Sequence, residues 1–259
     1  MFKAKLSDSQ VVRGIFESVS SIISEVNMKI DENGIGMAAM DLSHICLVSL
    51  NLKKEDFDEF ETDKEYELGI NLEDMVKIIK RSGSKDEITF IHNPEEKRLI
   101  IEMKPAEAKK SRTFTLALID LEGEEINLES LNSMEFPNKC SYPVQYMDEA
   151  IKDAEIFSEV LEVIVGDKLT FASTGNIGDM SYELEKEELD FYEFNEESKG
   201  IFAISFLKNI LKVKSISNVL DMSLKSESPL KMLFDILNSS QIMYYLAPRV
   251  EEEDDMYEE

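Results

Sequence analysis

The pattern of apolar and polar positions divides the first half of the chain into short strands and two amphipathic helices. Residues 2–6 alternate as in a half-buried strand, and apolar residues then recur at helical spacing from Val11 to Ile23, after the N-cap candidates Ser7, Asp8 and Ser9. Asn33-Gly34 is a hairpin-turn signal. We expect strands at 26–30, 35–40 and 45–52, a second helix from Asn71, and strands at 87–92, 99–104 and 111–118.

The second half repeats this order of elements. We expect a strand at 139–142, a helix carrying Met147 to Ala154, a hairpin of 162–165 and 168–172, a helix at 205–212, and strands at 219–224, 230–236 and 241–246. The hairpin turns at Gly34 and Asp167 are as far apart as the starts of the second helices, near 71 and 204. Two copies of one α+β unit, mostly antiparallel, explain this better than one irregular domain.

The stretch between the halves has the composition of a linker. It contains Gly123, Pro137 and six carboxylates, while Ile126, Leu128 and Leu131 are too sparse for a core of their own. We therefore expect an N-terminal domain at 1–118, an extended connector at 119–138 and a C-terminal domain at 139–250. Residues 251–259 are all carboxylate apart from Met256 and Tyr257, which predicts a disordered acidic tail.

Charge changes this picture more than composition does. The chain of 259 residues carries 54 acidic and 28 basic residues, a net charge of −26, so most of its surface repels nucleic acid. The second helix of each half is nevertheless basic on its polar side, and four lysines but no carboxylate lie between Lys199 and Leu220. Such lysines neutralise phosphates without reading bases. The alternative for any one of these helices is an ordinary solvated face.

Motifs of catalysis are missing from the sequence. It contains no P-loop, GxSxG or HExxH pattern, and its two cysteines and two histidines argue against a zinc site. We expect no cofactor and no catalytic residue, with a metal-dependent nuclease as one alternative. No apolar run approaches the ~18 residues of a membrane span, and the N-terminus lacks a signal-peptide core, so a soluble intracellular protein is expected.

Four segments resemble the sliding clamps of the proliferating cell nuclear antigen family, of archaeal type. Residues 34–57, GIGMAAMDLSHICLVSLNLKKEDF, resemble the family signature built on Met-Asp-x-Ser-His. LEDMVKIIKRSGSKDEITF is similar to the clamp's second helix, and RTFTLALIDLE to the strand that leads into its interdomain connector. Tyr244 to Arg249 resembles the terminal Tyr-x-Leu-Ala-Pro-Lys/Arg motif. The matches follow the family's order over nearly the whole chain.

The resemblance implies two similar domains of the DNA-clamp fold, with antiparallel sheets outside and helices lining a ring of three subunits. Such a ring slides on duplex DNA and tethers DNA polymerase, flap endonuclease and ligase through short peptide motifs, after a clamp loader has placed it. It would lie in the cytoplasm of an archaeal cell, or in the nucleus of a eukaryotic one. A checkpoint-type clamp subunit of a heterotrimer is the alternative within the same fold.

Three sets of residues follow from the basic helices and the resemblance together. The DNA-facing residues would be Arg13, Lys77, Lys80, Arg81, Lys152, Lys208 and Lys212. The pocket for partner peptides would contain Met40, His44, Leu47, Ile126, Leu128, Pro229, Tyr245, Ala247 and Pro248. The subunit interface would pair 111–118 with a strand near 176–184, through Thr113, Phe114, Thr115, Leu116, Met180 and Tyr182.

Overall fold

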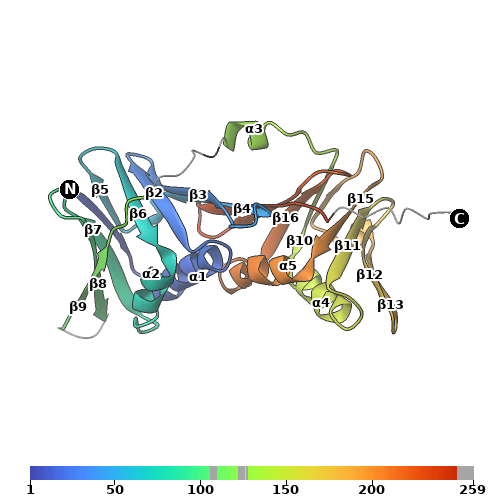
Figure 1. Cartoon of the computed structure of the whole chain (residues 1–259), viewed down its shortest axis with the longest axis horizontal. Helices are drawn as coiled ribbons and strands as arrows, with labels where there is room; N and C mark the ends of the chain where they lie inside the picture. The colour runs from blue at the N-terminus through green and yellow to red at the C-terminus, as the bar shows by residue number, and fades with distance from the viewer. Residues whose placement is uncertain (106–109, 122–125, 127, 250–259) are drawn as a thin grey trace, which may run out of the picture.

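The computed structural model describes residues 1–105, 110–121, 126 and 128–249. Two units of similar build lie side by side, with the helices along the lower edge of the view and the sheets beside and above them (Figure 1). The predicted tail at 251–259 and the acidic residues Glu122 to Glu125 fall outside the described residues.

The first unit contains two helices packed on short strands, in the order that the sequence pattern predicts. Its elements are β1 (Phe2–Leu6), α1 (Ser9–Ser20), β2 (Glu25–Asp31), β3 (Gly34–Met40), β4 (Cys46–Lys53), β5 (Glu59–Thr62), β6 (Tyr66–Asn71), α2 (Leu72–Ile79), β7 (Asp86–His92), β8 (Arg98–Pro105) and β9 (Arg112–Ala117).

The second unit repeats the first, and one short helix, α3 (Leu128–Asn132), lies between them. Its elements are β10 (Asn138–Pro143), α4 (Val144–Ala154), β11 (Val160–Val165), β12 (Leu169–Gly175), β13 (Gly178–Leu184), β14 (Phe191–Glu193), β15 (Ser198–Ala203), α5 (Ile204–Ile210), the 3-10 helix η3 (Leu211–Ser215), β16 (Val219–Leu224), β17 (Leu230–Asp235) and β18 (Gln241–Leu246).

The strands of the described residues form three antiparallel sheets. Their orders are β5-β1-β7-β8-β9, β14-β10-β16-β17-β18-β4-β3-β2-β6 and β13-β12-β11-β15. The nine-stranded sheet crosses from one unit to the other because β18 pairs with β4 along six residues. Strands β9 and β13 are sheet edges at opposite ends of the molecule (Figure 1).

Local sequence signals fix the ends of several elements. The carboxylate of Asp8 accepts hydrogen bonds from the amides of Gln10 and Val11 and so caps α1, and Asn71 caps α2 through the amide of Asp74. Gly34 has φ +146°, and a side chain there would meet the carbonyl oxygen of Leu52 at 1.9 Å. The hairpin at Asn33-Gly34 is therefore confirmed, with glycine required at its second position.

The apolar stripes of the helices face the core. Leu72, Met75, Val76 and Ile79 of α2 are buried, as the periodicity predicts. Helix α1 also packs against η3 of the other unit, where a Cβ on Gly14 would lie 2.3 Å from Cγ2 of Ile216. The hydroxyl of Ser21 donates to the carbonyl of Asn209 over 2.9 Å. The two units are thus joined through their helices as well as through the shared sheet.

The structure corrects three expectations. The connector is not wholly extended: α3 forms there, because Leu128 and Leu131 are one helical turn apart and can face the sheet together. The helix expected at 205–212 is α-helical only to Ile210 and continues as η3. Strands β5, β6, β14 and β15 were not predicted. Strands β5 and β14 are too short for a clear alternation, and Gly69 and Gly200 interrupt the other two.

Candidate DNA-facing surface and docking groove

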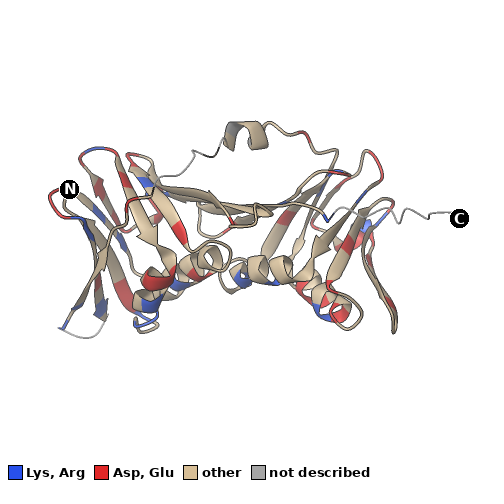
Figure 2. Cartoon of the chain, viewed as in Figure 1, with Lys and Arg blue, Asp and Glu red and all other residues tan. Residues whose placement is uncertain are grey.

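Helices α1, α2, α4 and α5 lie along the concave edge of the molecule (Figure 1). Figure 2 shows that this edge carries lysines and arginines, but also acidic residues among them. Of the predicted DNA-facing residues, six are exposed and Arg13 is half-buried. Lys214 of η3, which the prediction omitted, is also exposed. Lys214 lies in the stretch after Lys199 that contains no carboxylate, and this feature of the sequence could have identified it as a DNA-facing residue.

Most of these lysines already have a carboxylate partner. Lys77 donates to Asp74 and Lys208 to Glu155, both over 2.7 Å, and Lys80 lies 3.2 Å from Glu17. Lys152 and Lys214 both contact Asp148. The concave surface therefore has a much smaller net charge than its number of lysines indicates.

The arginines differ from one another. Arg13 donates to the carbonyls of Ser82, over 2.8 Å, and Lys80, over 3.4 Å, which places a cation at the C-terminal end of α2. Its guanidinium therefore stabilises the C-terminal end of α2, and this role does not depend on a bound ligand. For Arg81 and Lys212 the described part of the chain offers no carboxylate within ion-pair distance.

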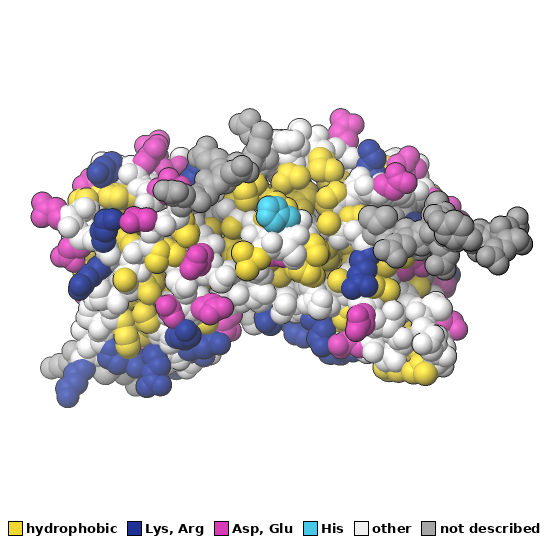
Figure 3. Space-filling model, in the orientation of Figure 1, with side chains coloured by type: hydrophobic (Ala, Val, Ile, Leu, Met, Phe, Trp, Pro, Cys, Tyr) yellow, Lys and Arg dark blue, Asp and Glu magenta, His cyan; other side chains and the backbone are white. Residues whose placement is uncertain are grey.

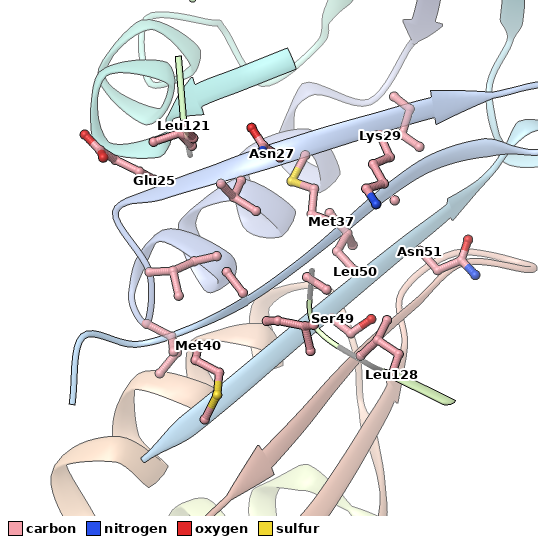
Figure 4. A pocket seen from close by; sticks show the side chains of 18 of the residues that line it. Glu25, Asn27, Lys29, Met37, Met40, Ser49, Leu50, Asn51, Leu121 and Leu128 are labelled. Atoms are coloured by element: carbon pink, nitrogen blue, oxygen red, sulfur yellow. The ribbon is translucent and has the colours of Figure 1, made fainter. Parts of the chain in front are cut away.

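A broad open groove of about 1320 Å³ lies over β2, β3 and β4. Four of the predicted pocket residues line it, namely Met40, His44, Ile126 and Leu128. Leu42, Leu121 and Phe206 line it as well and were not predicted. Figure 4 shows Leu121 and Leu128 of the connector beside side chains from the three strands. Figure 3 shows hydrophobic side chains gathered over the middle of this face.

The end of β3 and the loop between β3 and β4 present apolar side chains to solvent, and Met40 and Leu42 among them line this groove. Leu42 is 96% exposed, Met40 40% and Ile45 37%. The buried carboxylate of Asp41 holds the loop, because it accepts hydrogen bonds from the amides of Ser43, Ile45 and Cys46 and from the Ser43 hydroxyl. Burial raises the pKa of Asp41, but these hydrogen bonds outweigh it and leave the pKa below its ordinary value.

The remaining predicted pocket residues do not line the groove. Leu47 and Tyr245 are each 3% exposed and face one another across β4 and β18, so they form part of the sheet. The amide of Ala247 donates to the carbonyl of Ile45 over 2.8 Å. Pro229 and Pro248 are half-buried and do not line the groove. The structure thus brings Met40, His44 and the connector together at the groove and leaves the two prolines outside its lining.

The predicted subunit-interface residues lie on β9 and β13, both of which are edges. Phe114, Met180 and Tyr182 are only partly buried against the core, and Leu116 is buried. After burial itself, the neighbouring Glu149 contributes most to raising the pKa of Tyr182. Among the residues that the structure describes, neither strand has a strand neighbour on its outer side, so main-chain groups of both are left without a ladder partner there.

Two further findings concern chemistry. Among the described residues, no group of three or more histidine, cysteine or acidic side chains is arranged to hold a metal ion. Within the same residues, no helix is both long and apolar enough to cross a membrane.

Comparison with known proteins gives matches over almost the whole chain. The model of the proliferating cell nuclear antigen N-terminal domain matches residues 1–125, and that of its C-terminal domain matches residues 131–249. A protein of Methanothermobacter thermautotrophicus named DNA polymerase sliding clamp is 32% identical over 257 residues, which is 98% of this chain and all of that protein.

Two more relatives carry the same name. The protein of Methanococcus vannielii is 30% identical over 257 residues, covering 97% of this chain and all of the relative. The protein of Pyrococcus abyssi is 32% identical over 241 residues, covering 92% of this chain and 94% of the relative.

Proposed function

The chain belongs to the proliferating cell nuclear antigen family and acts as a DNA polymerase sliding clamp, and from this premise we propose how its surfaces serve that function. Three copies close head to tail into a ring around duplex DNA, with the helices inside. The outer groove receives short peptides of DNA polymerase, clamp loader, flap endonuclease and ligase. The ring performs no catalysis, binds no cofactor and works in the cytoplasm.

The strand pair inside the subunit supports the head-to-tail ring. Strand β18 of the second unit pairs with β4 of the first. In the repeat, β9 takes the place of β18, and β13 takes the place of β4. These two equivalents are the sheet edges at the two ends of the subunit. Pairing β9 of one copy with β13 of the next would repeat the internal junction and leave neither edge open.

The repeat also specifies a register for that pairing. Inside the subunit, Tyr244 of β18 faces Val48 of β4. Phe114 of β9 pairs with Ile101 of β8, and in the other unit Tyr244 of β18 pairs with Met232 of β17. Phe114 is therefore the equivalent of Tyr244. Met180 of β13 pairs with Ser173 of β12, and in the other unit Val48 of β4 pairs with Ala39 of β3. Met180 is therefore the equivalent of Val48. By this equivalence Phe114 of one copy lies opposite Met180 of the next, and Arg112 opposite Tyr182.

The charges at the two ends favour such a contact between identical chains. Lys110 and Arg81 are exposed around β9, and Arg112 is exposed beside them with one ion pair, to Asp86 at 2.8 Å. Asp153 and Asp179 are exposed around β13, and Glu149 beside them is half-buried. A basic end that meets an acidic end lowers the energy of head-to-tail assembly and opposes tail-to-tail pairing. This complementarity within one sequence favours a homotrimer over a heterotrimer of the checkpoint type.

The concave helices suit a DNA contact that holds by encirclement. A ring cannot dissociate sideways from a long duplex, so contacts to phosphates need only be weak and independent of sequence. The exposed lysines of α2 and α5 and Lys212 of η3 provide such contacts, and the ion pairs of Lys77 and Lys208 keep them weak.

The groove suits a short peptide with apolar anchors. Met40, Leu42 and Ile45 expose apolar area beside the connector on an otherwise charged chain, which is typical of a protein-binding site. Glu25, Asp31, Asp41 and Glu67 line the groove against Lys29 and Lys53, and this excess of acid favours basic residues that flank the anchors of the peptide.

The observation that carries the proposal is the internal β4–β18 junction with its two open equivalents. Light scattering on the purified chain should give the mass of a trimer. With a clamp loader, the ring should lengthen the products of a DNA polymerase on primed circular DNA. A chain that stays monomeric alone but assembles with two other clamp subunits would favour the heterotrimer, and cleavage of flapped DNA by the pure protein would favour a nuclease.

A further inference from the structure

Asp148 of α4 occupies an unusual position among the acids of the concave helices. Its carboxylate contacts Nζ of Lys152, one turn later on α4, at 2.7 Å, and Nζ of Lys214, on η3, at 2.6 Å. The two cations come from different elements, and each uses a different oxygen of the same carboxylate. Asp148 therefore ties α4 to the segment after α5.

This contact differs in burial from the other ion pairs of the concave surface. The side chain of Asp148 is 17% exposed, compared with 55% for Asp74 and 40% for Glu155. Exposed pairs contribute little free energy and exchange partners readily. A carboxylate that is mostly buried and doubly paired is screened less by water and salt. Lys152 and Lys214 are therefore held more firmly than Lys77 and Lys208.

The ionisation of Asp148 agrees with this geometry. Burial raises its pKa, but the hydrogen bonds from Lys152 and Lys214 outweigh burial and leave the pKa below the ordinary value. The carboxylate thus carries its charge at neutral pH, beside two ammonium groups. A phosphate that approaches either lysine meets the repulsion of this carboxylate as well as the attraction of the cation.

We propose that Asp148 is a positioning residue that withholds Lys152 and Lys214 from DNA and so keeps the contact of the second unit with the duplex weak. The inference rests on the proposed function, because it takes the concave helices as the DNA-facing surface. The lysines of the second unit then differ in their contact with phosphates. Lys212 has no ion pair within the described residues and Lys208 is only loosely paired, so these two contact phosphates. Lys152 and Lys214, held by Asp148, contact them little.

The test compares Asp148→Asn with Asp120→Asn. Both changes remove one negative charge, and Asp120 is 89% exposed in a surface pair with Lys97. Binding of the full-length ring to a short fluorescein-labelled duplex is measured by anisotropy at several salt concentrations. Asp148→Asn should bind at least about threefold tighter at low salt. Its log K should fall more steeply with log salt, by about 0.9 for each added phosphate contact, and Asp120→Asn should match wild type. Equal tightening by both variants, or none by Asp148→Asn, would overturn the proposal.

A second measurement tests the link to the two lysines. Lys152→Gln should hardly change duplex affinity in the wild-type ring, but should weaken it in the Asp148→Asn ring. Additive effects would show that Asp148 does not act through Lys152. If Asp148→Asn fails to assemble, Lys152→Gln and Lys214→Gln in the wild-type ring decide instead. Each should leave affinity within about twofold, while Lys212→Gln should lower it more.

These outcomes are separable from failure of the proposed function. Suppose that Lys212→Gln, and substitutions of the other exposed lysines of the concave helices, leave duplex binding and polymerase stimulation unchanged. The DNA-facing assignment itself is then wrong. If those lysines matter and Asp148→Asn behaves as wild type, only the role of Asp148 is wrong.

Discussion

The hydroxyl of Tyr245 donates a hydrogen bond to the main-chain carbonyl of Leu131, with 3.2 Å between the two oxygen atoms. Tyr245 belongs to β18, an inner strand of the nine-stranded sheet, and Leu131 belongs to α3, in the connector. The ammonium group of Lys231 lies 5.7 Å from the centre of the same tyrosine ring. One side chain thus couples the sheet to the rim of the docking groove.

The first prediction concerns this groove. Leu128→Ala combined with Tyr245→Ala should cost about 2 kcal/mol or more in the binding of a peptide of the form Gln-x-x-aliphatic-x-x-aromatic-aromatic. The reason is that Leu128 lines the groove and the Tyr245 hydroxyl holds the connector helix beside it. Tyr245→Phe removes only the hydrogen bond and should cost about 1 kcal/mol or less. Calorimetry measures both.

A matched control for the groove is Phe191→Ala, which removes a 52% exposed aromatic residue from the far edge of the central sheet. It should bind the peptide as wild type does, and all variants should keep the mass of the ring. Wild-type affinity in the double variant would place the peptide elsewhere.

The second prediction concerns the edge strand β9. Thr115→Pro removes a main-chain donor and fixes φ in the middle of this strand, so it should yield monomers. Thr115→Ala changes the same side chain without removing the donor and should stay trimeric. Light scattering at matched concentrations distinguishes the two, and a trimeric proline variant would argue against pairing through β9.

The third prediction tests the register between copies. Phe114→Cys with Met180→Cys should form a disulfide between neighbouring subunits under mild oxidation, because directly opposed strand residues have suitable Cα separations. Phe114→Cys with Leu184→Cys should link poorly. The native Cys46 and Cys140 are buried, which raises the pKa of each thiol to about 12, so they should not interfere. Covalent dimers and trimers on a denaturing gel report the result, and efficient linkage of the control pair would shift the register.

The fourth prediction concerns DNA. Changing Lys77, Lys80, Lys208 and Lys212 to alanine should reduce polymerase stimulation without preventing assembly, because all four side chains are exposed. A control that changes Lys97, Lys139, Lys168 and Lys186, which lie outside the concave helices, should stimulate as wild type does. Product lengths on primed circular DNA measure the effect, and equal losses in both variants would indicate only an effect of net charge.

The fifth prediction concerns pH. The folded-state pKa of Asp41 lies below the ordinary value of about 3.9. Its contribution to stability is therefore complete above that value and is lost as pH falls from about 4 through the folded-state pKa, since the unfolded chain takes up the proton first. Asp41→Asn should be less stable near neutral pH by about 1–3 kcal/mol and should lose less on acidification than wild type. Urea midpoints across this range measure the difference, with Asp120→Asn as an exposed control that should follow wild type.

The repeat and the helices could be predicted from the sequence because their signals are local. Asn33-Gly34 fixes a turn through its own backbone, and Leu72 to Ile79 carries a clear helical period. The ion pairs that join different elements of the concave surface could not be predicted in the same way. Asp148 reaches Lys214 only because the fold brings α4 and η3 together, and no spacing in the sequence encodes that contact.

The residues of the groove could also be predicted only in part. Met40 and His44 could be assigned because the loop that holds them resembles a known segment. Phe206 joins the groove from the second unit through tertiary packing alone, and periodicity assigns it to the apolar face of a helix. Leu42 is visible in the sequence as a leucine within a polar loop, but its 96% exposure depends on how Asp41 folds that loop.

The unbroken sheet through the middle of the subunit has a mechanical consequence for the proposed ring. Each subunit is a stiff arc, because β4 and β18 share six paired residues and α1 packs against η3 across the same junction. The joints between arcs have no such continuity, since each would be made by two separate chains. Strain applied to open the ring would therefore concentrate at one joint, where β9 leaves β13, while every arc keeps its curvature and its groove unchanged.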